Sequence, residues 1–406
     1  MANVSSSNGL EKRPKLRFPG FDEPWEENEL SHYLVENTER NRGLAFGKGD
    51  VLSVSGEYGV INQITFQGRS FAGESVADYH IVETDDIVYT KSPLKANPYG
   101  IIKVNKGIPG IVSTLYAVYH PLNTVAPRFV DLYFANDLRL NKFLKPLVNI
   151  GAKHDMKVNN SFVLTGTVVF PSISEQQKLV DFFAKLDRRI EAQRKIVDAL
   201  KKYKRGLLNK VFSNINGNIY PTVYLSEVAD FLQGLTYSPS DVSVAGYLVL
   251  RSSNIQNGVL SFDDCVYVDK KVDESLQVKC DDVIMCVRNG SKKLVGKTAL
   301  IPNDMAMTTW GAFMMIIRSK LNDTYIFHYL NSQMFFSQVF KDTGTATINQ
   351  ITKGILNECK LPIPPETARK QISKMLSSFD VKIQNAEICL TTLVELKKAL
   401  LQQLFI

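Results

Sequence analysis

The sequence has little of what disulfides, metal sites and membrane spans require. Its 406 residues include five cysteines, which are scattered and form no C-x-x-C pair, and five scattered histidines. This pattern argues against a disulfide framework or a zinc site and favours a reduced, cytoplasmic protein. No apolar run is long enough to cross a membrane, and residues 1–15 lack the apolar core of a signal peptide. We therefore expect a disordered polar tail over residues 1–15 and no membrane partner.

Motifs of the common enzyme classes are also missing. There is no H-E-x-x-H and no G-x-S-x-G, and the turn "ANPYG" (96–100) has one proline where amino-group methyltransferases need two. The stretch "NGSKKLVGKT" (289–298) imitates a phosphate-binding loop. However, five residues rather than four separate Gly290 from Gly296, and the pattern predicts a strand afterwards where that loop needs a helix. An ATPase acting through Lys297 remains the weakest alternative, and we expect a chain that binds rather than catalyses.

What the sequence does have is enough material for two or three domains and a modest basic excess. Its 44% hydrophobic and 22% charged residues are ordinary for a globular protein. The net charge of +7 favours a polyanionic partner. Residues 175–212 hold eleven Lys and Arg against five Asp and Glu. A solvated helix face explains that excess, and so does a strip that faces nucleic acid or an acidic subunit.

The chain contains an internal repeat. Residues 171–212 and 364–405 align without a gap at an offset of 193, and the offset pairs Pro171 with Pro364, Leu186 with Phe379, Ile190 with Ile383, and Phe212 with Phe405. In both copies apolar residues recur at steps of three and four, with Gln193 as a polar gap in the first copy and Ala386 filling it in the second. This period is typical of a coiled-coil seam. We expect two long helices that pack antiparallel against each other.

Each helix follows a segment rich in short strands and turns. We expect an α+β fold with two globular domains, each built on a mostly antiparallel sheet and separated by the two helices, so that the chain is an internal pseudo-two-fold repeat. The predicted boundaries are a first domain at 16–170, a first helix at 171–213, a second domain at 214–363 and a second helix at 364–406. Shorter helical segments are predicted at 129–145 and 323–341.

The basic loop at 289–298 lies between two predicted strands, "DDVIMCVR" and "KTALIPND". We therefore predict that residues 289–298 form the basic tip of a β-hairpin rather than a nucleotide-binding loop. Most such tips are solvated surface. The alternative is a tip that presents cations and amides to a polyanion: Arg288, Asn289, Lys292, Lys293 and Lys297.

Several stretches resemble the specificity subunits of Type I DNA restriction–modification systems. These are the opening "RPKLRFPGFDEPWEENELS", the helix start "FPSISEQQKLVDFFAKLDRRIEAQ" and, in the second half, "LRSSNIQNGVL", "DDVIMCVRNGSKKLVGKTALI" and "TGTATINQITKGILNECKLPIPP". The resemblance extends over nearly all residues from about 16 onward. The second helix departs from the pattern, with Ala368-Arg369 where the first copy has Glu175-Gln176.

The resemblance implies a non-catalytic DNA-binding subunit that serves in defence against foreign DNA. Each domain would read one half of a split target in double-stranded DNA, and the paired helices would set the gap. Two modification subunits, which methylate adenine N6 with S-adenosylmethionine, would dock on the chain. Restriction subunits that use ATP and Mg²⁺ would join them optionally, and no cofactor is expected on this chain.

The same resemblance suggests which side chains face DNA. Arg288 would read guanine and Asn289 adenine, while Lys292, Lys293 and Lys297 would hold phosphates. Further candidates share polar or basic side chains in predicted loops: Arg251, Ser252, Asn254, Thr345 and Thr347 in the second half, and Lys91, Ser92, Lys95, Asn97, Lys103, Lys106, Lys153 and His154 in the first.

A different class of function stays open. A coiled-coil scaffold whose globular halves bind peptides would have the same helices and the same lack of catalytic motifs. DNA binding that weakens steeply with salt distinguishes the two, because the scaffold predicts none.

Overall fold

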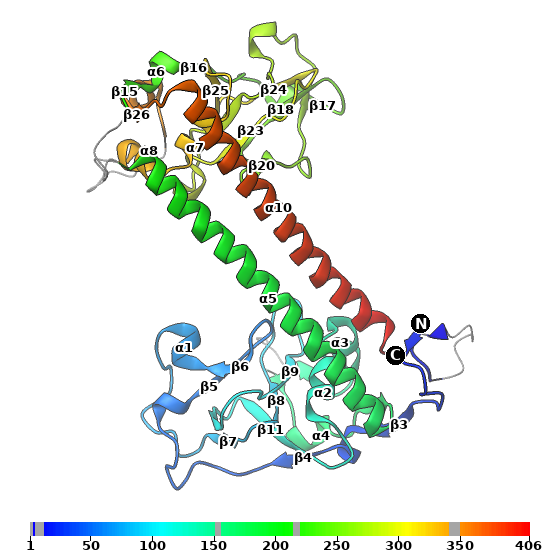
Figure 1. Ribbon diagram of the computed structural model, residues 1–406. Coiled ribbons are helices and arrows are strands. Elements are labelled where there is room, and N and C mark those ends of the chain that lie inside the picture. Colours follow the sequence, from blue (N-terminus) through cyan, green and yellow to red (C-terminus); the bar gives the residue numbers. More distant parts are fainter. Residues whose placement is uncertain (1–2, 5–11, 151–155, 214–219, 341–349) are drawn as a thin grey trace. The chain divides into compact units, whose positions relative to one another are not determined.

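The computed structural model describes residues 3–4, 12–150, 156–213, 220–340 and 350–406. The chain divides into two compact units. The first comprises Met1–Ala192 with Leu390–Ile406, and the second comprises Gln193–Cys389. Each unit contains a sheet-rich domain and a part of both long helices (Figure 1). Within the ranges described, none of the helices has the length and apolar character that crossing a membrane requires.

The first unit is built on a four-stranded antiparallel sheet. Its strands lie in the order β4 (Leu34–Asn37), β11 (Tyr116–Pro121), β8 (Ile87–Thr90) and β9 (Ile101–Val104). Two short helices follow β11: α2 (Pro127–Tyr133) and α3 (Asp137–Leu144). The remaining elements are α1 (Gln63–Gln67), α4 (Asn160–Val163) and the antiparallel strand pairs β1–β2 (Asn3–Val4, Leu16–Arg17), β3–β14 (Glu26–Glu29, Thr167–Phe170), β5–β6 (Leu52–Ser55, Gly59–Asn62), β7–β10 (His80–Val82, Gly110–Val112) and β12–β13 (Asn149–Ile150, Met156–Lys157).

The second unit repeats this sheet in the same order. Its strands are β16 (Ala229–Gln233), β25 (Met314–Ser319), β22 (Val283–Cys286) and β23 (Thr298–Leu300), again all antiparallel. Helices α7 (Tyr325–Leu330) and α8 (Gln333–Val339) follow β25. The other elements are α6 (Leu225–Val228), α9 (Lys353–Glu358), the pairs β15–β26 (Thr222–Tyr224, Lys360–Pro362) and β19–β20 (Ile255–Gln256, Val259–Leu260), and a second sheet of β17 (Val242–Ser243), β21 (Tyr267–Val268), β18 (Tyr247–Leu250) and β24 (Thr308–Trp310), in which β18 and β24 are parallel.

The predicted α+β class with mostly antiparallel sheets is confirmed. The predicted helical segments at 129–145 and 323–341 are each a pair of short helices. The break falls where a polar side chain caps the second helix. Asn136 accepts from the backbone N–H of Arg139 at 3.1 Å, and Ser332 accepts from that of Phe335 at 3.2 Å.

The central hairpins of the two sheets share a backbone plan that the sequence repeat did not show. Each hairpin begins after an aspartate with positive φ, Asp85 at 68° and Asp281 at 64°, and its ten-residue connection ends on a glycine with positive φ, Gly100 at 91° and Gly296 at 87°. Aspartate tolerates a φ near 65°, whereas a φ near 90° favours glycine, which lacks a Cβ. At Gly100 an added Cβ would also lie 2.0 Å from the Thr90 carbonyl oxygen. The connections 91–100 and 287–296 are therefore equivalent in length and in backbone route.

The two long helices are α5 (Ile173–Phe212) and α10 (Glu366–Gln403). Gln193 fills the polar gap of the first seam by donating its side-chain amide to the carbonyl of Ala386 at 3.0 Å. Partners on α10 move backward along the chain as those on α5 move forward, so the helices pair antiparallel, as predicted. Three ion pairs support this pairing: Asp187–Lys397 in the first unit, and Lys201–Glu387 and Lys204–Asp380 in the second.

The first turns of the two helices anchor equivalent loops with different chemistry. Gln176 of α5 accepts a hydrogen bond from the backbone N–H of Ala126, before α2, at 2.9 Å. Its counterpart at the repeat offset is Arg369 of α10, whose Nε donates to the Asp323 carboxylate, before α7, at 2.6 Å. The first helix thus holds its loop through a backbone N–H, whereas the second helix, with arginine in place of glutamine, holds its loop through a carboxylate.

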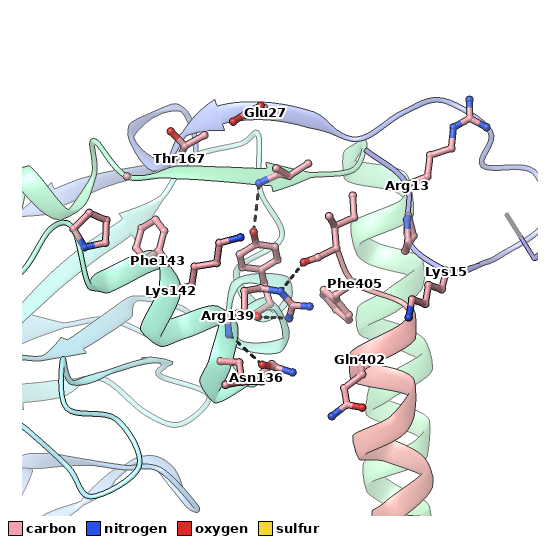
Figure 2. Close-up of a pocket in the computed structure, with 17 residues that line it drawn as sticks. Arg13, Lys15, Glu27, Asn136, Arg139, Lys142, Phe143, Thr167, Gln402 and Phe405 are labelled. Carbon is pink, nitrogen blue, oxygen red and sulfur yellow. Dashed lines mark hydrogen bonds between the residues drawn. The ribbon is translucent and has the colours of Figure 1, made fainter. Parts of the chain in front are cut away.

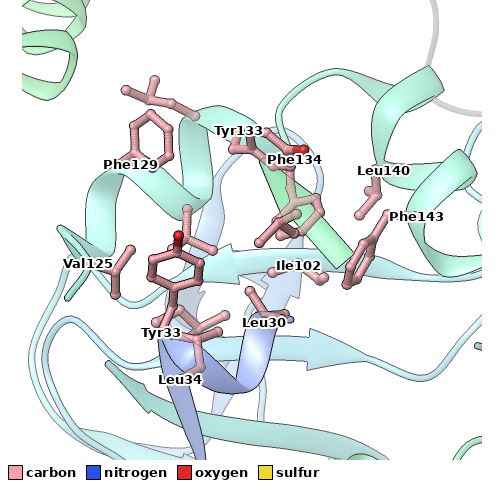
Figure 3. Close-up of a cluster of buried hydrophobic side chains, with 14 of the residues drawn as sticks. Leu30, Tyr33, Leu34, Ile102, Val125, Phe129, Tyr133, Phe134, Leu140 and Phe143 are labelled. Carbon is pink, nitrogen blue, oxygen red and sulfur yellow. The ribbon is translucent and has the colours of Figure 1, made fainter. Parts of the chain in front are cut away.

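An aromatic ring at the C-terminal end of each long helix enters a domain core: Phe212 is the last residue of α5, and Phe405 lies two residues beyond α10. The Phe405 ring lies 5.6 Å from that of Phe129 in the first unit, and Figure 2 shows Phe405 beside Arg139 of α3. The Phe212 ring takes the equivalent place in the second unit, 5.1 Å from that of Tyr325. Figure 3 shows the first core, where side chains from the sheet meet those of α2 and α3. The helix ends are thus part of both cores.

Candidate nucleic-acid interface

A cleft lies at the end of strand β22, where segments from distant parts of the second unit meet. The backbone N–H groups of Val287 and Arg288 both donate to the carbonyl of Phe313, at 3.0 and 3.2 Å. Arg288 also forms an isolated antiparallel bridge with Gln350. The end of strand β16 adds Gln233 to the same cleft. Backbone contacts therefore fix where these side chains emerge.

The cleft holds about 300 Å³, and five of its ten lining residues are solvent-exposed and polar. The guanidinium carbon of Arg288 lies 5.4 Å from the centroid of the Phe313 ring, and Phe313 is itself 60% exposed. Contact with an aromatic face limits the orientations of a guanidinium, while its N–H edge remains available for a planar acceptor. The polar side chains that accompany it are Gln233, Gln350, Thr352 and Lys353.

Asn289 joins two loops of the predicted site. Its side-chain amide donates to the Ser252 hydroxyl at 3.2 Å, and its oxygen accepts from the backbone N–H of Ser291 at 2.9 Å. The loop after β22 is thereby tied to the loop after β18. The structure therefore brings Arg288, Asn289 and Ser252 together, as a shared surface requires.

The three lysines of the basic loop have different surroundings. Lys297 is half-buried, and its ammonium donates to the carbonyl of Ile255 at 2.7 Å, so it links the loop to strand β19. Lys292 and Lys293 are exposed on a single 3₁₀ turn, Lys292–Leu294. The strand predicted after the loop is present as β23, which confirms that the loop is not the start of a nucleotide-binding helix.

The other two candidates of this half build the loop after β18. Asn254 is completely buried; its oxygen accepts from the backbone N–H of Arg251 at 2.9 Å, and its amide donates to Ser261 and Asp264. Arg251 is paired with the Asp264 carboxylate at 2.8 Å. Asn254 thus holds the loop in shape, with its amide groups turned inward. Thr345 and Thr347 lie outside the described residues.

In the first unit, the connection 91–100 occupies the place of the Arg288 loop. The ammonium of Lys91 donates to the Asn160 side-chain oxygen at 3.1 Å, and the Asn160 amide donates to the Glu36 carboxylate at 2.9 Å. Burial lowers the pKa of Lys91, and the charge of Glu36 opposes that shift. Ser92 is half-exposed and Lys95 is exposed on the same loop.

The remaining candidates of the first half do not gather there. Asn97 is buried, and its amide donates to the Asp137 carboxylate at 3.0 Å. Lys103 and Lys106 both face Asp131 of α2, at 3.9 and 2.6 Å. Since Thr90 pairs with Ile101 and Ile87 with Val104, Lys106 lies at the opposite end of the β8–β9 hairpin from loop 91–100. Lys153 and His154 lie outside the described residues.

Sequence reasoning missed five exposed lining residues of the cleft: Gln233, Phe313, Gln350, Thr352 and Lys353. All of them except Phe313 lie more than 50 residues from the basic loop in sequence, so no local motif joins them to it. Phe313 offered a weak signal, since it directly follows "WGA" at a turn before an apolar strand. A large exposed aromatic beside a turn is a reason to look for a ligand surface.

Comparisons with known proteins identify the second domain. A family model described as "Type I restriction modification DNA specificity domain" matches residues 220–391. The chain is similar to the specificity subunits of Type I restriction enzymes. It is 26% identical over 190 residues to the StySPI specificity subunit of Salmonella potsdam, covering 44% of this chain and 40% of that one. It is 27% identical over 174 residues to the EcoKI specificity subunit of Escherichia coli (strain K12), covering 40% and 36%.

These matches span about two fifths of the length of the two curated specificity subunits. The fold likeness is broader. A crystal structure of the Type I restriction-modification system S subunit from M. genitalium has a TM-score of 0.57 at 13% identity, covering 97% of this chain and 99% of that one. A solved chain from a study of complex assembly in the type I R-M system has the same TM-score at 15% identity, covering 95% and 98%. The Arg288 cleft lies wholly within the specificity domain at 220–391.

Proposed function

We propose that this chain is the specificity subunit of a Type I restriction–modification complex, that it binds double-stranded DNA, and that it has no catalytic activity of its own. The observation that carries the proposal is the Arg288 cleft. It presents an exposed guanidinium and two exposed glutamine amides inside a DNA specificity domain. The comparisons support the assignment to the Type I specificity subunits, and the side chains of the cleft support the recognition of DNA bases.

The cleft has the donors and acceptors that read base edges. A guanidinium donates two parallel hydrogen bonds to O6 and N7 of guanine, and a glutamine amide pairs with N6 and N7 of adenine. Each such pair discriminates against a wrong base by about 1–3 kcal/mol. The exposed ammonium groups of Lys292, Lys293 and Lys353 suit phosphate contacts, which position the protein without specifying sequence. Asn289 and Ser252 hold the reading loop in place.

The repeat extends the proposal to the whole chain. The first domain, at 16–170, reads the other half of a split target, and α5 and α10 set the gap between the halves. Two modification subunits dock on the chain and methylate adenine N6, with S-adenosylmethionine bound to them. Restriction subunits that use ATP and Mg²⁺ join the same assembly. The same sheet order in both units supports two reading modules of one kind.

Methylation mapping tests this function. The chain is expressed with the modification subunit encoded beside it in a host without adenine methylation, and the genomic DNA is sequenced for N6-methyladenine. The expected result is a split motif of two short half-sites with a fixed gap. A stable complex that leaves the genome unmodified would overturn the proposal and favour a scaffold without DNA specificity.

A further inference from the structure

A large groove in the first unit lies beside the docked end of α10. It holds about 1050 Å³ and is bounded by α3, by the strand pair β3–β14 and by the last residues of α10 (Figure 2). Gln402 of α10 and Phe405, two residues beyond the end of that helix, line one side, and Leu138 and Lys142 of α3 line the other. Leu138 is 81% exposed, which is unusual for a leucine at the edge of an apolar core.

The second unit has the same groove at the equivalent place. It holds about 640 Å³ and lies beside the docked end of α5, against α8 and the strand pair β15–β26. At the helix repeat offset, Phe212 and Asn209 replace Phe405 and Gln402. On the facing short helix, the second residue is Leu138 in α3 and Met334 in α8.

The likeness of the grooves contrasts with the difference between the loops at the strand ends. Equivalent loops of the two units carry Arg288 in one and Ser92 in the other, and Phe313 is replaced by Leu115. The grooves instead keep an aromatic, an amide and a flexible apolar side chain at matching positions. The strand-end loops differ between the two units, which suits the reading of two different half-sites. The grooves have similar side chains in both units, which suits the binding of the same ligand twice.

The charge of the grooves limits the classes of ligand that they can bind. Lys15 and Lys142 are exposed in the first groove, where Glu27 is the one acid among the lining residues described, and Glu27 is paired with Lys12. The second groove has exposed Lys210 and Lys360, and no carboxylate lines the part described. The phosphates of a DNA backbone would pair with these lysines, but they would make no apolar contact with Leu138. An acidic protein segment with an apolar side chain uses both.

We propose that each groove binds the same acidic, apolar segment of a partner protein, so that one chain holds two identical copies of that partner. The inference rests on the proposed function, which names the partner as the modification subunit, and it adds the surfaces that hold it. The apolar side chain of the segment packs against Leu138 in the first groove and against Met334 in the second. Its carboxylates pair with Lys142 in the first groove and with Lys210 in the second.

The test counts copies. The full chain is co-expressed with the modification subunit, and the purified complex is weighed by native mass spectrometry. Lys142→Glu and Lys210→Glu should each lose one of two copies, and the double variant should lose both. Leu138→Asp, at a position that is 81% exposed and outside the core, should act like Lys142→Glu. Lys271→Glu, an exposed lysine outside both grooves, is the matched control and should keep two copies.

The other outcomes are equally decisive. A double variant that still carries two copies at unchanged affinity overturns the inference. Two retained copies with weakened binding to DNA would show that the grooves hold phosphates instead. Failure of the proposed function is distinguishable, because a wild-type complex with two copies and no methylated motif would leave the grooves intact and remove the DNA reading.

Discussion

The two sheet domains share a framework and differ at the surface that the framework presents. Strands β4, β11, β8 and β9 correspond in order to β16, β25, β22 and β23, and the connections 91–100 and 287–296 have the same length. At the end of β22 the second domain exposes Arg288 beside Phe313. At the end of β8 the first domain instead has Lys91 joined through Asn160 to Glu36.

This contrast shows how one fold can read two sequences. The backbone route is fixed by positive-φ residues and strand register, which do not depend on the exposed side chains. The loop side chains can then change without cost to the core. A free guanidinium edge suits a guanine, whereas an ammonium already bonded to an amide and close to a carboxylate has less to offer a base. We therefore expect the half-sites to differ in composition.

The largest expected effect tests the framework itself. Asp282 accepts two hydrogen bonds from Arg318, at 2.8 and 2.7 Å, and Asp86 at the equivalent place is hydrogen-bonded to His120 at 2.5 Å. Asp282→Ala strands a partly buried cation and should destabilise the second unit by on the order of 3 kcal/mol. Asp86→Ala should cost the first unit only about 1–2 kcal/mol, because a histidine can lose its charge. Hydrogen exchange resolved by unit measures both, and equal losses would contradict the contrast.

The next effect tests the reading cleft. Arg288→Ala should cost about 1–3 kcal/mol of discrimination and relax the target at a single base pair of one half-site. Arg288→Lys should not restore it, because an ammonium cannot form the bidentate pair. Methylation mapping of both variants gives the measurement. Loss of specificity in both half-sites, or in neither, would show that Arg288 does not read a base.

A smaller effect concerns acid stability. Burial, followed by the charge of Lys204, lowers the pKa of His328 to about 3; burial, followed by Arg40 and Lys91, lowers that of His80 to about 4. Both histidines stay neutral in the folded protein, while the unfolded chain takes up protons below about pH 6.5. Stability should therefore fall as the pH is lowered, and near pH 5.5 each histidine should cost its own unit about 1.2 kcal/mol per pH unit.

Melting followed between pH 7 and 5 measures this loss. His328→Gln removes the titrating group and should flatten the pH dependence of the second unit alone. A slope unchanged in that variant would mean that His328 already carries a proton in the folded state.

The smallest effect separates phosphate contacts from base contacts. Lys293→Ala should weaken DNA binding uniformly across sequences and reduce the slope of log affinity against log salt by about one. Its target should stay the same, in contrast to Arg288→Ala. Titration of the complex with cognate and non-cognate duplexes at several salt concentrations checks this. A change in sequence preference would assign Lys293 a reading role instead.

The sequence predicted the long helices well because their signal is periodic and repeated. An apolar seam extending through about eleven helical turns can be recognised from the sequence of each helix alone. The polar residue in that seam, Gln193, is hydrogen-bonded to the backbone of Ala386 in the structure. The duplicated sheet was harder to see. Its hairpins align at an offset near 196 rather than 193, and their apolar strands carry little identity beyond Asp85-Asp86 and Asp281-Asp282.

The candidate site was predicted only in part, for a physical reason. Sequence identifies a basic loop, but it does not reveal which polar groups are consumed inside the fold. Lys297 and Asn254 resemble ligand contacts in the sequence, and the structure gives both a bonding partner within the domain. The sequence did not predict Gln233 and Gln350 as cleft residues, because strand pairing rather than sequence proximity brings them to Arg288.

The most direct measurement compares the methylated motif of the wild-type complex with that of a chain in which residues 220–362 are exchanged for those of another specificity subunit. Both complexes are expressed in a host without adenine methylation, and both genomes are sequenced. We predict that one half-site changes while the other half-site and the gap stay the same. A change in both half-sites, or a motif unaffected by the exchange, would contradict the account of two independent reading domains on one framework.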